Sequence, residues 1–154
     1  MNVAIITARK GSKSIINKNI YPVLNKPLIS YPLQAALDSK LISKVYVSTD
    51  CDQIAKIAKE MKCELIERPL NLQGDDVNHG DVIKHAVIYV NKRIENLKNI
   101  VLLLGNTVML SAKLIDDSLD ILNKNIDYDS VMSVWEAADD HPLRALEINN
   151  GFLK

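Results

Sequence analysis

Residues 3–13 read Val-Ala-Ile-Ile-Thr-Ala-Arg-Lys-Gly-Ser-Lys, an apolar run that passes directly into a basic loop. The β-branched run Val3–Thr7 predicts a buried strand. In the loop, Gly11 lets backbone N–H groups approach an anion, and the arginine and lysines can neutralise phosphate. The loop matches neither the Walker A nor the GxGxxG pattern. It therefore fits a polyphosphate site and a solvated basic turn about equally well.

Apolar runs of strand length alternate with segments of helical periodicity along most of the chain. Strands are expected at 45–47, 64–67, 100–104, 130–135 and 144–149, and helices at 28–42, 52–61, 79–96 and 111–124. The all-apolar run 100–104 is typical of a strand in the middle of a parallel sheet. The alternation predicts an α/β fold with a doubly wound, Rossmann-like, mostly parallel sheet flanked by helices. Ligands of such sheets bind at the carboxyl ends of the strands.

Composition narrows the function classes. The chain has 154 residues, 47% of them hydrophobic, and its 19 basic and 19 acidic residues give a formal net charge of zero. That length supports one domain over residues 1–154. A basic excess typical of duplex DNA binding is missing. Two cysteines without a CxxC pair favour a reduced compartment. With no signal peptide or membrane span expected, we predict a cytoplasmic protein without nucleic-acid or membrane partners.

Several motifs occur in the same order as in a known enzyme family. They are residues 5–13, Asn17-Lys18-Asn19, Lys26-Pro27-Leu28-Ile29, Val47-Ser48-Thr49-Asp50, Arg68-Pro69 with Asp75 and Asp81 downstream, Val82-Ile83 with His85-Ala86, Ser133-Val134, His141-Pro142 and Ala145-Leu146. The chain resembles the acylneuraminate cytidylyltransferases over essentially its whole length. The resemblance implies a nucleotide-diphospho-sugar transferase type of fold. It also implies transfer of CMP from CTP to an acidic, sialic-acid-like sugar with release of pyrophosphate.

The resemblance also implies roles for particular residues. Arg9, Lys13 and Lys18 would hold the triphosphate as catalytic cations, Arg68 would lie at the cytosine end, and Arg144 beside the sugar carboxylate. The sugar hydroxyl would attack the α-phosphate directly, without a covalent enzyme intermediate. The candidate substrate-binding residues are Ala8, Lys10, Gly11, Ser12, Asn19, Arg68, His79, Asn106, Thr107 and Arg144. Mg²⁺ is the implied cofactor, and no ligand for it is assigned in this chain.

Two departures from the family keep alternatives open. Leu104 and Leu110 stand where members commonly have glutamine and arginine, which puts the identity of the sugar in question. Family members are longer, so we expect a C-terminally truncated nucleotidyltransferase domain whose metal ligands lie outside this chain and whose full-length form is a homodimer. The alternatives are a catalytically silent nucleotide- or sugar-binding module and a nucleotidyltransferase of the same fold with another base or sugar.

Three smaller features complete the expectations. Asp50 and Asp52 could form a metal pair, but a helix cap and a first-turn carboxylate are the favoured interpretation. Cys51 and Cys63 are expected to be small, buried or half-buried residues. Asn150-Gly151 predicts a two-residue hairpin turn.

Overall fold

The computed structural model describes residues 1–11, 15–74, 76–134, 148–149 and 152–153. Its elements follow the chain in the order β1 (Asn2–Ala8), η1 (Lys18–Ile20), β2 (Pro22–Val23), β3 (Lys26–Pro27), α1 (Ser30–Leu37), β4 (Lys44–Thr49), α2 (Asp52–Glu60), β5 (Glu64–Glu67), η2 (Leu70–Leu72), α3 (His79–Asn91), β6 (Asn99–Leu104), α4 (Ala112–Lys124), β7 (Ile148–Asn149) and β8 (Phe152–Leu153).

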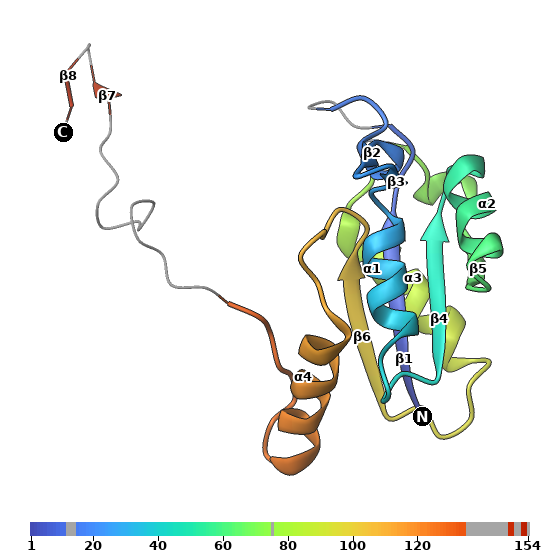
Figure 1. The fold of residues 1–154 in the computed structure, drawn as a ribbon, viewed down its shortest axis with the longest axis vertical. Coiled ribbons are helices and arrows are strands. Elements are labelled where there is room, and N and C mark those ends of the chain that lie inside the picture. Colours follow the sequence, from blue (N-terminus) through green and yellow to red (C-terminus); the bar gives the residue numbers. More distant parts are fainter. Residues whose placement is uncertain (12–14, 75, 135–147, 150–151, 154) are drawn as a thin grey trace.

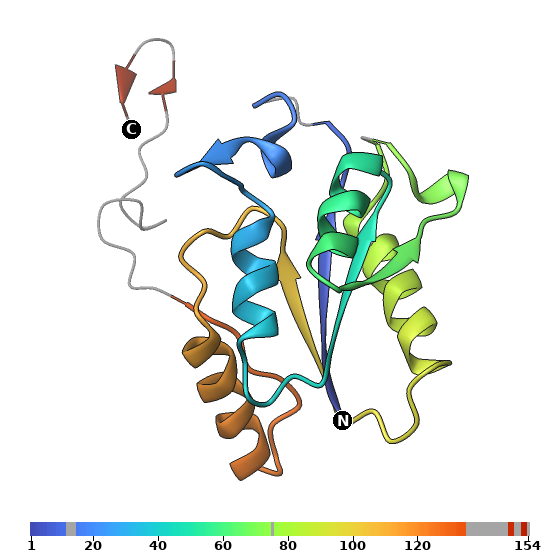
Figure 2. The same cartoon turned by 45° about the vertical axis from the view of Figure 1, so that its right-hand side comes forward.

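The central sheet contains four strands in the order β5-β4-β1-β6, and all of its pairings are parallel. Figure 1 shows α1 in front of the sheet and α3 behind it, and Figure 2 shows the same layers turned by 45°. The crossovers through α1 and α2 build the sheet outward from β1 in one direction. The crossover through α3 then returns on the other face to place β6 on the far side of β1. The doubly wound, Rossmann-like sheet predicted from the sequence is confirmed.

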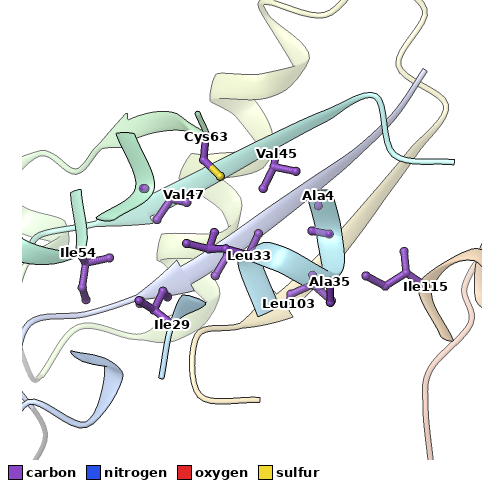
Figure 3. Packing of buried hydrophobic residues seen from close by; sticks show 14 of the residues in the cluster. Ala4, Ile29, Leu33, Ala35, Val45, Val47, Ile54, Cys63, Leu103 and Ile115 are labelled. Atoms are coloured by element: carbon purple, nitrogen blue, oxygen red, sulfur yellow. The ribbon is translucent and has the colours of Figure 1, made fainter. Parts of the chain in front are cut away.

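Apolar side chains fill both faces of the sheet because successive strand residues point to opposite sides. On one face, Ala4 and Ile6 of β1 pack with residues of α1, α2 and α4, including Leu33, Ile54 and Ile115 (Figure 3). On the other face, the core is formed by Val3, Ile5, Tyr46, Ile66, Ala86, Val90 and Ile94. Strand β1 is therefore buried on both sides, and it carries the basic loop at its carboxyl end.

Two helices are shorter than the sequence predicts. The expected helix 28–42 is observed only over Ser30–Leu37, and the expected helix 79–96 ends at Asn91. Pro32 lies in the first turn of α1, where its missing N–H costs no intrahelical hydrogen bond. Leu41 and Ile42 follow the helical apolar spacing, but they pack on the core from a turn beyond the helix.

The prediction that residues 100–104 form a strand in the middle of the sheet is wrong in its position. Strand β6 forms an edge of the described sheet, not its middle. Its Val101 and Leu103 pack toward α1 and α4, whereas Leu102 and Leu104 are 41% and 48% exposed on the opposite side. An apolar run alone does not distinguish a central strand from an edge strand, because both can be rich in the same residues.

The expected strand 130–135 is also wrong over its described part. Residues 130–134 are not in a strand, and Met132 and Val134 are exposed. A strand needs a neighbour for its backbone hydrogen bonds, and no described segment pairs with these residues. Within the expected strand 144–149, Ile148–Asn149 pairs antiparallel with Phe152–Leu153, as predicted for a hairpin. The rest of that strand and the turn at 150–151 lie outside the described residues.

Two further expectations concern the cysteines and membranes. Cys51 and Cys63 are both buried and unpaired, and burial raises the pKa of the Cys63 thiol to about 11. Among the described helices, none combines the length and the apolar character that a membrane-spanning segment needs.

Candidate functional site

A cleft of about 250 Å³ opens where the direction of the sheet crossovers reverses. Thr7 near the end of β1 pairs with Ser48 of β4 on one side and with Leu104 of β6 on the other, so the three strands end at one level. This is the switch point at which open α/β sheets bind ligands. The lining residues are Thr7, Arg9, Gly11, Lys18, Asn19, Arg68, Gly74, Val77, His79, Val82, Leu104, Gly105 and Asn106.

Positive charge dominates this cleft. Arg9, Lys18 and Arg68 line it, and no aspartate or glutamate is found among its described lining residues. Helix α3 begins at His79 on the rim, so the positive end of the helix dipole adds to the field of the three cations. The cleft is therefore suited to an anionic ligand such as a phosphate chain.

The loop that follows β1 is held in shape by the short helix η1. The side-chain amide Nδ2 of Asn19 donates to the carbonyl oxygen of Arg9 at 3.2 Å. The backbone oxygen of Asn19 accepts from the N–H of Ile29 at 2.8 Å, which ties the loop to the start of α1. Gly11 has a φ of 67°, a conformation that favours glycine. Asn19 thus braces the backbone beside Arg9 as well as lining the cleft.

Arg68 lines the cleft and joins the ends of β1 and β4. Its Nε donates to Ser48 Oγ at 3.0 Å, and its Nη2 donates to the backbone oxygens of Ser48 at 2.7 Å and Ala8 at 3.3 Å. Only 8% of the residue is exposed. Burial lowers the pKa of the Arg68 guanidinium, and the charge of Asp50 acts in the opposite direction. Arg68 is therefore a buried structural brace that also presents charge to the cleft.

His79 is positioned by a strand residue far away in sequence. Its ring nitrogen Nε2 lies 2.9 Å from Oγ1 of Thr7, a buried side chain on β1. The preceding Asn78 caps α3 by accepting from the N–H of Gly80 at 2.8 Å. The cap fixes the start of the helix, and the hydroxyl of Thr7 fixes the ring.

Gly105 allows the chain after β6 to approach β1 closely. A Cβ at this position would lie 2.7 Å from Cδ1 of Ile29 and 2.8 Å from Cβ of Ala8. The N–H of Gly105 instead donates to the backbone oxygen of Thr7 at 3.2 Å. This contact brings Asn106 to the wall of the cleft.

The cleft brings together many, but not all, of the residues predicted from the sequence. Seven of them line it, namely Arg9, Gly11, Lys18, Asn19, Arg68, His79 and Asn106. Ala8 is buried and contributes its carbonyl oxygen to Arg68, while the N–H of Lys10 donates to Asp50. Thr107 is not among the described lining residues. Ser12, Lys13 and Arg144 lie outside the described residues.

Sequence reasoning assigned no binding role to several lining residues, namely Thr7, Gly74, Val77, Val82, Leu104 and Gly105. Thr7 and Gly105 carried a usable signal, because both lie at or just after the carboxyl ends of predicted strands. Gly74, Val77 and Val82 carried no such signal, because their approach to the cleft depends on how the segment after β5 folds back.

The described residues include no ready-made cluster of metal ligands. Among them, no group of three or more histidine, cysteine, aspartate or glutamate side chains is placed to hold a metal ion. Asp50 is not the helix cap either, since Cys51 takes that position and Asp50 accepts two backbone N–H groups. The lining side chains are cationic or neutral, a donor set that suits phosphate better than a divalent cation.

The sheet topology and the cationic cleft define a Rossmann-like α/β protein. Residues 3–145 match the family model described as Cytidylyltransferase, so the chain belongs to the cytidylyltransferase family.

Curated relatives agree with this assignment. The chain is 32% identical over 152 residues to the pseudaminic acid cytidylyltransferase and UDP-2,4-diacetamido-2,4,6-trideoxy-beta-L-altropyranose hydrolase of Helicobacter pylori, covering 97% of this chain and 28% of the relative. It is 41% identical over 85 residues to the N-acylneuraminate cytidylyltransferase of Escherichia coli O18:K1:H7, covering 55% of this chain and 20% of the relative. The matched regions thus cover less than a third of the length of either relative.

Among solved structures, CMP:2-keto-3-deoxy-manno-octonic acid synthetase complexed with CTP superposes with a TM-score of 0.66 at 20% identity, covering 82% of this chain and 48% of that one. A cytidylyltransferase from Leptospira borgpetersenii superposes with a TM-score of 0.65 at 22% identity, covering 82% of this chain and 50% of that one. At these identities the structures support the fold.

Proposed function

We propose that this chain binds CTP in the cationic cleft and serves transfer of CMP to an acidic, sialic-acid-like sugar with release of pyrophosphate. The observation that carries the proposal is the gathering of Arg9, Lys18 and Arg68 around one cleft at the switch point of the sheet. Membership of the cytidylyltransferase family supports cytidine as the nucleoside. The names of the relatives support an acidic nonulosonic sugar as the acceptor.

In the proposed reaction, a hydroxyl oxygen of the sugar gives up its proton to water and forms a bond to the α-phosphorus of CTP. The bond from that phosphorus to the oxygen that bridges to the β-phosphate breaks, and pyrophosphate leaves. Negative charge grows on the leaving oxygen, and the cations Arg9 and Lys18 reduce its cost. From the same loop, Lys13 would also hold the triphosphate and Ser12 would bind the nucleotide. The protein acts mainly by positioning the reactants and neutralising charge.

The remaining contacts follow the same proposal. Arg68, His79 and Asn106 also line the cleft and would meet the base and the ribose. Arg144 would bind the sugar carboxylate through two parallel hydrogen bonds. Magnesium dependence, homodimer formation and a cytoplasmic location stay predictions that accompany this function.

A pyrophosphate-release screen tests the proposal. CTP, UTP, ATP and GTP are each combined with acidic nonulosonic sugars and with neutral hexoses, using the complete reading frame from the source gene. We expect release only with CTP and an acidic sugar. Calorimetry on the 154-residue chain should show CTP binding that weakens by about 1.5–3 kcal/mol in Arg9→Ala, which removes a charged partner of the phosphates. Release with another nucleotide would instead support a nucleotidyltransferase with a different base.

A nucleotide-binding module without turnover is the second candidate. It is favoured by the cationic lining, because Arg9, Lys18 and Arg68 can bind phosphates whether or not turnover follows. This candidate predicts CTP binding by calorimetry together with no pyrophosphate release from the complete reading frame with any sugar.

A further inference from the structure

Asp50 connects two loops that lie far apart in the sequence. It follows β4 directly, and its two carboxylate oxygens accept from different backbone groups. Oδ1 accepts from the N–H of Lys10 at 2.6 Å, and Oδ2 accepts from the N–H of Gly74 at 3.1 Å. Hydrogen bonds from backbone N–H groups to a carboxylate are stronger than those to neutral acceptors. One side chain therefore holds the loop after β1 and the segment after β5 together.

Both segments contribute to the lining of the cleft. Arg9 and Gly11, which flank Lys10, line it from the loop after β1, and Gly74 lines it from the segment after β5. Gly74 has a φ of 98°, a conformation that other residues rarely adopt. The backbone at Gly74 can therefore turn its N–H toward Asp50 with little strain. The distance between these two parts of the lining is thus set through Asp50, which is not among the described lining residues.

The charge of Asp50 also matters for the cleft. Asp50 favours the charged form of the buried Arg68 guanidinium, whose pKa is otherwise lowered by burial. The same negative charge would repel a triphosphate bound nearby. Asp50 can therefore help nucleotide binding only if its effect on loop geometry and on Arg68 outweighs this repulsion. The two effects predict opposite changes when the charge is removed.

We infer that Asp50 is a positioning residue for the nucleotide, which sets the spacing between the Arg9–Gly11 loop and the Gly74 segment through its two backbone hydrogen bonds. The inference rests on the proposed binding of CTP. It assigns Asp50 a role beyond a helix cap or a metal ligand. It also removes the N–H of Lys10 from the groups that can bind phosphate, since Asp50 already accepts from it.

The test compares Asp50→Asn and Asp50→Ala with Asp52→Asn as a matched control. Asp52 is an exposed carboxylate in the first turn of α2, so its substitution removes the same charge two residues away. Asparagine keeps one acceptor oxygen, and alanine keeps none. We expect amide exchange at Lys10 and Gly74 to accelerate about tenfold or more in Asp50→Ala and at one of the two sites in Asp50→Asn. Both amides should exchange at the wild-type rate in Asp52→Asn.

Nucleotide affinity provides the second measurement. The Kd for CTP by calorimetry should rise about tenfold or more in Asp50→Ala, less in Asp50→Asn, and little in Asp52→Asn. In the complete enzyme, KM for CTP should rise while kcat and KM for the acidic sugar stay near wild type. A variant that is only less stable would lose active protein and lower kcat without changing KM.

The outcomes separate the two proposals. If wild type binds CTP and Asp50→Asn binds it as well or more tightly, repulsion dominates and the positioning role is overturned. Unchanged exchange at Lys10 and Gly74 in Asp50→Asn would also overturn it, even if Asp50→Ala fails to fold. If wild type binds no CTP, the proposed function fails and this inference fails with it, whatever the exchange data show.

Discussion

Oγ1 of Thr7 and Nε2 of His79 lie 2.9 Å apart, although 72 positions separate the two residues in the sequence. Thr7 is buried in the sheet and His79 is the exposed first residue of α3. The hydrogen bond thus joins the central strand to the helix that crosses back behind it. It fixes the orientation of the His79 imidazole ring in the cleft. A substitution at Thr7 can therefore test this orientation while His79 itself stays unchanged.

Thr7→Val replaces the hydroxyl with a methyl group of similar size. Because valine suits a strand and Thr7 is only 6% exposed, we expect the fold to persist with a loss of about 0.5–1.5 kcal/mol in the free energy of unfolding. The freed His79 ring should weaken CTP binding roughly threefold to tenfold. Urea denaturation and calorimetry measure the two effects.

Thr49→Val is the matched control for that prediction. Thr49 is equally a buried strand-end threonine, but its hydroxyl accepts from the N–H of Cys51 and makes no contact with His79. We expect a similar loss of stability with little change in CTP affinity. Equal losses of affinity in the two variants would contradict a specific role for the contact between Thr7 and His79.

Gly105→Ala should destabilise the protein by about 1–3 kcal/mol, since the added Cβ would overlap Ile29 and Ala8 at 2.7 and 2.8 Å. Ala8 is part of β1 and cannot rotate away, so the end of β6 must shift. Gly80→Ala is the control, because its Cβ would meet only Asn78 Oδ1 at 3.1 Å and alanine favours the helix. Thermal unfolding of the two variants checks this; equal melting temperatures would contradict the close approach at Gly105.

Local sequence patterns predicted those strands and helices whose bounds depend mainly on their own residues. The strand at 64–67 has the predicted bounds, and β1 extends the predicted run by one residue at each end. The end of α1 was not predictable, because the helical apolar spacing continues through Leu41 while the chain turns. That turn is held by Asp116, which accepts from the N–H of Leu41 across 75 positions of sequence. A contact at that separation leaves no local pattern.

The candidate site likewise has features that local sequence predicts and features that it does not. The cations of the first loop were predictable, because charge and glycine concentrate within a few residues after a strand. The bracing by Arg68 was not, since its acceptors Ser48 and Ala8 are identified only when β1 and β4 are known to be neighbours. The edge position of β6 was unpredictable for the same reason, since strand order depends on how crossovers pack and not on the strand's own residues.

Arg68→Lys tests the buried brace at the ends of β1 and β4. A lysine carries one ammonium group and cannot reproduce the hydrogen bonds of Nε and Nη2 to Ser48 and Ala8. We expect a loss of about 2–3 kcal/mol in the free energy of unfolding and weaker CTP binding. Arg93→Lys is the control: Arg93 is exposed over the ring of Tyr89, and its substitution should cost no more than about 0.5 kcal/mol. Similar losses of stability by urea denaturation would contradict the role of Arg68.

Asp116→Asn tests the link between α4 and the turn after α1, and its effect should depend on pH. Hydrogen bonds from Ser39 Oγ at 2.5 Å and from the N–H groups of Lys40 and Leu41 lower the pKa of the Asp116 carboxyl, while burial acts in the opposite direction. A carboxyl whose pKa is lowered by folding adds stability above its unfolded pKa, ordinarily 3.8. That stability is lost as the pH falls through the lower folded value.

We therefore expect Asp116→Asn to cost no more than about 1 kcal/mol near neutral pH, because the carboxylate is only half-buried. The difference from wild type should stay constant from about pH 7 to pH 5 and then shrink as the pH falls below about 4. Urea denaturation across that range measures it. Asp117→Asn is the control, since Asp117 pairs only with the exposed Lys113 among the described residues and should change stability by less than about 0.5 kcal/mol. A difference between Asp116→Asn and wild type that grows on acidification would have the wrong sign, because protonation of Asp116 removes the same charge that the asparagine lacks.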